Sequence, residues 1–129
     1  MRPTIVVDAN PIISALIGGF SRGVFFNHNF NFITTEFTIK EVEKYLPYIA
    51  KKAKTSEKFI ESFFHFLPLK VYSKDKYCES IEKAKLLITD EKDVDVLALA
   101  LETNHPIWSN DPHFEGIKEV SLIKTKDFV

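Results

Sequence analysis

The chain has 129 residues, 45% of them hydrophobic, which suits one globular domain with an adequate core and leaves little room for a second. Its net charge of -1 excludes a global positive field that would attract nucleic acid or an anionic membrane, so any such binding must be local. A single cysteine excludes an internal disulfide framework, and neither a membrane-spanning run nor a signal-peptide pattern is present, so we expect one cytoplasmic domain over residues 1–129.

The predicted elements alternate between strands and helices. In chain order they are a strand at 4–8, a helix at 10–18, a short helix at 22–27, a strand at 31–34, helices at 36–53 and 56–66, a strand at 69–72, helices at 74–88 and 93–102, and strands at 106–109 and 120–123. Pro47 lies within the apolar pattern of the third helix and predicts a kink or break there. Strands separated by helices predict an α/β fold of three layers, α/β/α, with a central parallel sheet.

Two predicted strands end on an aspartate. The segment TIVVDANPIISALI carries Asp8 where its strand stops, and IWSNDPHF carries Asp111 just after the strand that contains Trp108. An aspartate at such a point commonly caps the following helix, and for Asp8 alone this role and a role in a site are equally supported. Because ligands of parallel sheets bind beyond the carboxyl ends of the strands, two such acids favour a shared site.

Further acids lie near the starts of apolar helices. Glu41 in TIKEVEKYL has an ordinary alternative as a solvated acid favoured by the helix dipole. In DEKDVDVLALALE, residues 94–101 are all apolar except Asp95, so this helix is expected to be buried on most sides, with Asp93 and Asp95 at its N-terminal end. Asp93 has its own structural alternative, because it can complete a capping arrangement that begins at Asp90.

Carboxylates that converge in a low-dielectric cleft repel one another, and a divalent cation relieves this repulsion. Mg²⁺ and Mn²⁺ prefer oxygen ligands, and one ion or a pair about 3.5–4 Å apart can activate water for phosphodiester hydrolysis. The acids therefore predict metal-assisted phosphoryl chemistry without identifying the substrate.

These segments resemble, in the same order, the motifs of the PIN domain family, the nuclease fold of VapC-type toxins and of several RNA-processing factors. The resemblance runs from VVDANPIISALI through ITTEFTIKEV and DVDVLALALE to IWSNDPHF. It implies a PIN-like domain whose cleft gathers four catalytic, metal-binding acids: Asp8, Glu41, Asp93 and Asp111. The implied activity is Mg²⁺- or Mn²⁺-dependent endonucleolytic cleavage of RNA, usually single-stranded, by a metal-activated water.

The third acid of this set needs a choice between two residues. The family's acid precedes the first alanine of an Ala-x-Ala pair by five residues, which selects Asp93 over Asp95. Asp95 points about 200° away around the helix, so we interpret it as an auxiliary acid or the partner of a lysine. Asn10 and Ser109 match small polar positions of the family and are expected to orient the carboxylates, although for Asn10 simple capping is an equal alternative.

Few residues suggest how RNA would be held. The densest basic patch is KKAK, with Lys51, Lys52 and Lys54, which is a candidate RNA contact but is better explained as a solvated helix end. Arg22 is a second weak candidate whose role is open. His113 is the histidine expected nearest the site, and an ordinary surface-loop position is its favoured interpretation.

The leading hypothesis is a PIN-type ribonuclease, with the toxin of a toxin–antitoxin pair as one version of it. The resemblance then implies a small antitoxin over the cleft region and a homodimer, for which the phenylalanines of EKFIESFFHFL form either core or a dimer face. That Phe-rich helix and the particular residues of the motif DVDVLALALE also leave another RNA-processing role open. The alternatives are a catalytically silent PIN-like module that binds RNA or protein, against which the four acids argue, and a receiver-like domain, which lacks its middle-strand aspartate here.

Overall fold

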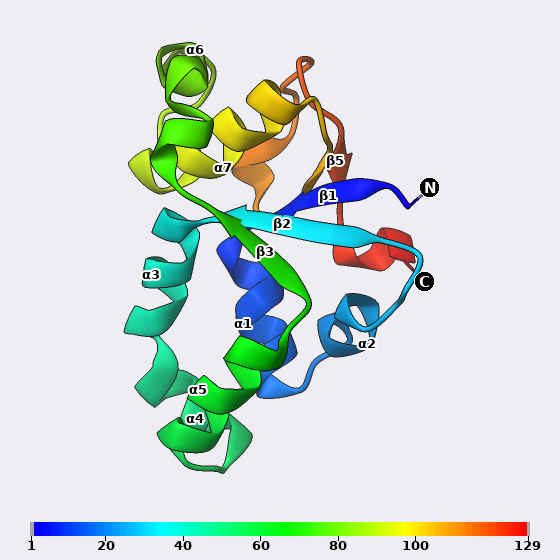
Figure 1. Cartoon of the computed structure of the whole chain (residues 1–129), viewed down its shortest axis with the longest axis vertical. Coiled ribbons are helices and arrows are strands. Elements are labelled where there is room, and N and C mark those ends of the chain that lie inside the picture. Colours follow the sequence, from blue (N-terminus) through cyan, green and yellow to red (C-terminus); the bar gives the residue numbers. More distant parts are fainter. Residues whose placement is uncertain (1, 129) are drawn as a thin grey trace.

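The computed structural model describes residues 2–128 (Figure 1). Within these residues the strands form one parallel sheet of five, in the order β3-β2-β1-β4-β5. The strands are β1 (Thr4–Val7), β2 (Asn31–Thr35), β3 (Leu69–Tyr72), β4 (Ile107–Trp108) and β5 (Leu122–Ile123). The predicted parallel sheet is confirmed, and the last two strands are shorter than predicted because only two residues of each pair with a neighbour.

The helices follow the predicted order with two differences. They are α1 (Ala9–Ile17), α2 (Ser21–Phe25), α3 (Glu36–Lys44), α4 (Leu46–Ala53), α5 (Glu57–Phe66), α6 (Ile81–Leu87) and α7 (Glu91–Thr103). The break predicted around Pro47 occurs at Tyr45, since proline lacks an N–H donor and fits only the first turn of the new helix. The segment predicted as helix over 74–88 begins instead as two 3-10 turns, Lys74–Lys76 and Cys78–Ser80, before α6.

Helices cover both faces of the sheet, which confirms the three-layer α/β/α architecture. Because successive strand residues point to opposite faces, Val6 packs against α7 and α6, whereas Val7 packs against α1, α4 and α5. Figure 1 shows α6 and α7 on one side of the sheet and α1, α3, α4 and α5 on the other. Helix α7 is buried over most of its length, as predicted, and it delivers its first turn to the carboxyl ends of the strands.

The Phe-rich helix α5 packs differently from a simple core helix. Ile60 and Phe64 are its buried residues, whereas Phe59 and Phe66 are 57% and 78% exposed. The core interpretation is therefore wrong for Phe59 and Phe66, because the buried stripe of the helix runs one position away from them.

No helix within residues 2–128 is long and apolar enough to cross a bilayer.

Candidate metal centre

The centre begins where β1 and β4 end side by side. The parallel register pairs Val7 with Trp108, and the Asp8 N–H donates to the Trp108 carbonyl at 3.0 Å. Asp8 occupies the N-cap position of α1, but its carboxylate accepts a hydrogen bond from Ser109 Oγ at 2.7 Å and makes no capping bond to the helix. The buried Asp8 carboxylate therefore faces the end of the neighbouring strand, which favours the site over the capping interpretation.

Helix α7 supplies the second carboxylate. Asp90 is its N-cap and accepts a hydrogen bond from the Lys92 N–H at 3.0 Å, so the helix is capped by Asp90 and not by the side chain of Asp93. Asp93 is 4% exposed, and its Oδ2 lies 2.8 Å from His113 Nδ1. The Asp93 carboxylate thus points to the loop after β4 and does not complete a capping box.

The loop after β4 supplies the third carboxylate. The Asp111 N–H donates to Ser109 Oγ at 3.0 Å, and Asp111 Oδ1 accepts from the His113 N–H at 2.9 Å. One carboxylate oxygen from each of Asp8, Asp93 and Asp111 lies within 4.8 Å of the other two. Three acids that are far apart in the sequence therefore meet in one place, which we call the aspartate trio.

Glu41 approaches the aspartate trio from α3. Thr35 Oγ1 caps this helix by accepting from the Thr38 N–H at 2.9 Å, which sets its direction away from the sheet end. Glu41 and the aspartate trio line one pocket of about 200 Å³, although Glu41 is outside the group of oxygens within 4.8 Å. Glu41 Oε1 accepts from Lys44 Nζ at 2.9 Å, and this contact raises the pKa of Lys44.

The electrostatics of the aspartate trio are unfavourable without a cation. Burial raises the pKa of Asp8 above its usual value, and the hydrogen bond from Ser109 opposes this shift only in part. Burial also raises the pKa of Asp93, to about 6. The negative charges of Asp8 and Asp111 raise this pKa further, whereas the hydrogen bond with His113 lowers it. The residues fit a hard divalent cation, because carboxylate oxygens of three aspartates converge where burial and mutual repulsion disfavour their negative charges.

The ring of His113 contacts three aspartates, two of which belong to the aspartate trio. Its Nδ1 lies 3.4 Å from Asp111 Oδ1 and 3.6 Å from Asp90 Oδ2, in addition to the shorter contact with Asp93. The hydrogen bond with Asp93 raises the pKa of His113. His113 is exposed, as the surface-loop interpretation expects, but its ring also contacts Asp93, which that interpretation does not include. Its place two residues after Asp111 is the sequence signal for this role.

Among the pocket residues that the sequence did not single out for the site, Tyr45 and Lys92 have side chains suited to contact a substrate. Tyr45, at the break between α3 and α4, and Lys92, in the first turn of α7, both line the pocket of the aspartate trio. Tyr45 is four residues after Glu41, and that helical spacing places both on one face. Lys92 is the one cationic residue that lines this pocket within residues 2–128.

Ser109 and Asn10 differ in what they contact. Ser109 is fully buried, and its hydroxyl joins the Asp8 carboxylate to the Asp111 backbone, as expected for a residue that orients the acids. Asn10 Oδ1 instead accepts from the Asn110 N–H at 3.3 Å, so it ties α1 to the loop after β4. Asn10 lines the pocket without bonding to a carboxylate.

Asp95 is turned away from the aspartate trio. Its Oδ2 accepts a hydrogen bond of 2.5 Å from the hydroxyl of the buried Tyr77, whose pKa is raised by burial and by this contact. Asp95 lines a different pocket, beside α6. The expected lysine partner is therefore replaced by a tyrosine, because the helix directs Asp95 toward the core between α7 and the 3-10 turns.

The weak RNA-binding candidates lie outside the pocket of the aspartate trio. Arg22 donates from Nε to the Ala15 carbonyl at 2.9 Å and from Nη2 to the Leu16 carbonyl at 3.2 Å, so it closes the end of α1. Its guanidinium also lies 4.5 Å from the centre of the Phe63 ring. The basic patch at the end of α4 is exposed and comprises Lys51, Lys52 and Lys54.

Comparison with known proteins gives one family and several similar structures. A family model described as a PIN domain matches residues 6–126. No curated protein matches the chain in sequence.

Solved structures that resemble the chain include VapBC complexes and a toxin–antitoxin complex. A chain of VapBC2 from Rickettsia felis, bound to a DNA fragment from their promoter, is 15% identical with a TM-score of 0.65, over 94% of this chain and 98% of that one. A chain of a toxin–antitoxin complex from Klebsiella pneumoniae is 15% identical with a TM-score of 0.69, over 94% of this chain and 97% of that one. A chain of DNA-bound VapBC from Salmonella typhimurium is 19% identical with a TM-score of 0.69, over 97% of this chain and 99% of that one. At these identities the likeness establishes the fold.

Proposed function

The chain belongs to the PIN domain family, and on that premise we propose that it is a Mg²⁺- or Mn²⁺-dependent endoribonuclease. The observation that carries the proposal is the aspartate trio, in which oxygens of Asp8, Asp93 and Asp111 lie within 4.8 Å of one another at the carboxyl end of the sheet. A divalent metal, when bound there, supplies Lewis-acid stabilisation and an activated water for phosphodiester hydrolysis.

In this proposal the side chains of the chain divide the work. The aspartate trio holds the metal, one ion or two, and Glu41 completes the acidic lining from the opposite wall of the pocket. Ser109 fixes Asp8 and the Asp111 backbone at once, so that both acids keep their places when the substrate arrives. His113 orients Asp93 through the bond to its Nδ1.

Two residues support a nucleic-acid strand as the substrate of this pocket. Lys92 brings a positive charge to the rim, where it would contact a phosphate oxygen beside the scissile bond. Tyr45 is an exposed ring at the same rim and offers a stacking surface for an unpaired base. A cation and an exposed aromatic beside an acidic centre favour single-stranded RNA.

We further propose that the chain is the toxin of a toxin–antitoxin pair, whose antitoxin covers the cleft region. The support is that the similar solved structures are complexes of this kind. The exposed Phe59 and Phe66 of α5 support a homodimer. The alternative is a catalytically silent module, and the retention of all the acids favours the enzyme over it.

The decisive test is cleavage of a labelled, unstructured RNA by the purified protein with Mn²⁺ or Mg²⁺, and again after EDTA. We expect metal-dependent cleavage that Asp8→Asn lowers by at least about 100-fold, because the amide keeps the shape of the carboxylate and loses its charge. Glu57→Gln, which neutralises an exposed acid on α5, is the matched control and should cleave like the wild type. Equal cleavage by Asp8→Asn and the wild type would reject the assignment, and a wild type that cleaves with neither metal would favour the silent module.

A further inference from the structure

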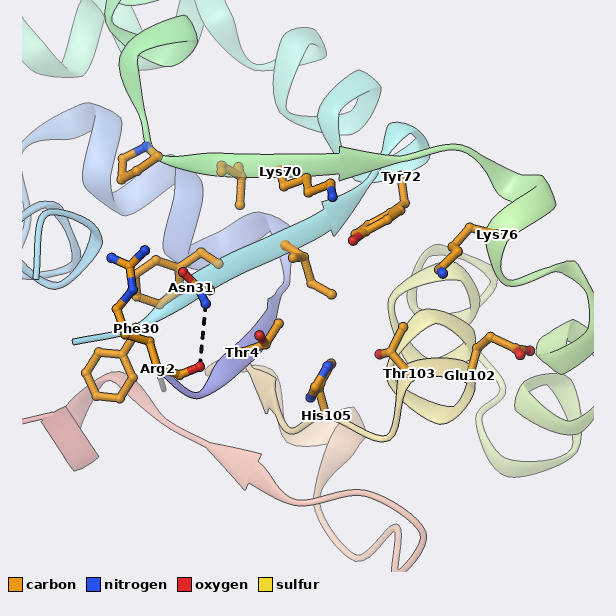
Figure 2. Close-up of a pocket in the computed structure, with 14 residues that line it drawn as sticks. Arg2, Thr4, Phe30, Asn31, Lys70, Tyr72, Lys76, Glu102, Thr103 and His105 are labelled. Carbon is orange, nitrogen blue, oxygen red and sulfur yellow. Dashed lines mark hydrogen bonds between the residues drawn. The ribbon is translucent and has the colours of Figure 1, made fainter. Parts of the chain in front are cut away.

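A second, larger pocket lies away from the aspartate trio, on the face of the sheet that α7 covers in part (Figure 2). It has a volume of about 900 Å³ and extends along β2 and β3 to the last turn of α7. We call it the basic groove and define it by the residues Arg2, Lys70, Tyr72, Lys76 and His105. The acids of the aspartate trio do not line it.

The groove exists because the edge strand β3 is left without a covering helix on this face. Helix α7 packs against β1, β2 and β4, and β3 pairs only with β2. Lys70 pairs with Ile33 and Tyr72 pairs with Thr35, so both side chains point to the same face as Ile33, which packs against α7. Parallel strands usually carry apolar residues on both faces, so a lysine at this position indicates a surface that is kept open.

The charges of the groove are concentrated around one aromatic ring. Lys70 Nζ lies 5.1 Å and Lys76 Nζ 5.6 Å from the centre of the Tyr72 ring, and Figure 2 shows the ring between the two side chains. Within residues 2–128 neither ammonium has a carboxylate within 4.0 Å. Glu102, the acidic residue of the lining, accepts from Ser80 Oγ at 2.8 Å. Two lysines without ionic partners therefore face one ring.

We propose that the basic groove binds the phosphates of single-stranded RNA outside the acidic pocket, with Lys70 and Lys76 as phosphate contacts and Tyr72 as the apolar surface between them. The choice of RNA rests on the proposed function. Charge complementarity selects a polyanion, and an aromatic ring between two cations suits a strand in which bases alternate with phosphates.

The sheet register places one end of the groove, at Tyr72, level with the aspartate trio, whereas Thr4, Asn31 and His105 line the other end beside the amino ends of the strands. Val6 pairs with Ile33, so Asp8 stands opposite Thr35, which itself pairs with Tyr72. Tyr72 is thus two strands from Asp8 at the same level of the sheet, a separation of roughly 10 Å between backbones. An RNA held at the aspartate trio can therefore continue past Tyr72 into the groove, whose two lysines would add to the single positive charge of Lys92 in the acidic pocket.

The test compares two double variants that remove equal charge. Lys70→Ala with Lys76→Ala changes the groove, and Lys83→Ala with Lys85→Ala changes exposed lysines of α6. Binding of a labelled oligouridine is measured by fluorescence anisotropy in EDTA over a series of salt concentrations. We expect the groove variant to bind about tenfold more weakly at low salt, and the slope of log K against log salt to fall by about 1.4, since each single-strand phosphate contact contributes about 0.7. The control should keep the wild-type slope.

The contribution of the ring is tested separately. Tyr72→Phe should bind oligouridine like the wild type, whereas Tyr72→Leu, which keeps an apolar side chain and removes the ring, should bind severalfold more weakly. Unchanged affinity and slope in the lysine variant would overturn the groove proposal.

The outcomes separate this inference from the proposed function. Groove-dependent binding in a protein that cleaves no RNA would reject the nuclease and keep the groove. Metal-dependent cleavage that Asp8→Asn abolishes, with no change of slope in the groove variant, would keep the nuclease and reject the groove. Polyglutamate is the second probe: if the groove variant loses affinity for polyglutamate and not for oligouridine, the occupant is an acidic protein segment and the RNA assignment is wrong.

Discussion

Asp8 stands where a buried strand turns into a helix, a position at which aspartate usually serves as a cap. Here the side chain bonds to Ser109, which comes 101 positions later and also receives the Asp111 N–H. One buried hydroxyl therefore connects the carboxylate of Asp8 to the backbone N–H of Asp111. All these residues are candidates that the sequence singles out, but the bridge through Ser109 depends on β1 and β4 being neighbours, which no local pattern specifies.

Asp93 and Asp95 provide a matched pair of substitutions. We expect Asp93→Asn to reduce metal-dependent RNA cleavage by at least about 100-fold, since it removes a member of the aspartate trio. Asp95→Asn should cleave RNA like the wild type and lose about 1 kcal/mol of stability, because the bond from Tyr77 would then go to a neutral acceptor. Cleavage assays and urea denaturation of both variants check this.

The reverse pattern, with cleavage lost in Asp95→Asn and kept in Asp93→Asn, would contradict the assignment of the third acid. Tyr77→Phe serves as the control for stability, because it deletes the same hydrogen bond from the other side and leaves both carboxylates in place.

Helix α1 shows how an element can be predicted while its termination depends on distant groups. Its end near Gly18 was expected, and Gly18 adopts a left-handed φ of 108° that suits glycine. The carbonyls of Ala15 and Leu16 accept hydrogen bonds from Arg22, whose guanidinium also contacts Phe63 of α5. The arginine considered for RNA thus joins three helices, α1, α2 and α5.

Arg22→Ala should therefore lower the free energy of unfolding by about 2 kcal/mol, because two charge-assisted hydrogen bonds and a ring contact are lost from a partly buried site. We expect the affinity of the folded variant for oligouridine to be that of the wild type. Urea denaturation and anisotropy measure the two quantities, with Lys58→Ala as a control for loss of one positive charge on α5. A variant of normal stability with reduced RNA affinity would show that Arg22 contacts RNA after all.

The α3–α4 segment illustrates what an apolar pattern misses. A continuous stripe over 36–53 with a proline inside it predicted either a kink or a break, and the structure has a break. That break leaves Tyr45 42% exposed at the rim of the acidic pocket. The sequence shows where the proline lies, but the placement of Tyr45 at the pocket depends on the direction of α3 after its cap at Thr35.

The molecule as a whole separates its charges. The aspartate trio lies at the carboxyl ends of the strands, and the unpaired lysines of the basic groove lie beside the edge strand. A net charge of -1 conceals this arrangement, since opposite charges cancel in the sum. The burial of like charges at the acidic end lowers the stability of the fold, and this loss has a measurable dependence on pH.

The pKa of Asp93 is about 6 in the folded protein against 3.8 for an unperturbed aspartate, so the folded state binds more protons between these values. Stability of the metal-free protein should therefore rise as the pH falls from 7 to 4, by up to about 3 kcal/mol from this group. The bond to Asp93 also raises the pKa of His113, so the stability that His113 contributes is gained as the pH falls toward 6.5, before Asp93 is protonated.

The check is urea denaturation in EDTA at several pH values for the wild type and Asp93→Asn. We expect the variant to be the more stable protein at pH 7 and its advantage to disappear toward pH 4, because the protonated carboxyl and the amide are both neutral. A constant difference across this range would contradict the raised pKa.

Local patterns were sufficient for much of this protein. Period-two and helical spacings predict most of the strands and helices, apart from the 3-10 turns before α6, and the order of acids along the chain selects Asp8, Asp93 and Asp111 as candidates. These features are encoded by residues close together in sequence, which is why they can be read directly. Other features could not be predicted in this way: the parallel pairing of β1 with β4, the bond between His113 and Asp93, the bond between Asp95 and Tyr77, and the uncovered face of β3. Each depends on the long-range packing of elements around the sheet, and such packing has no signature in a single stretch of sequence.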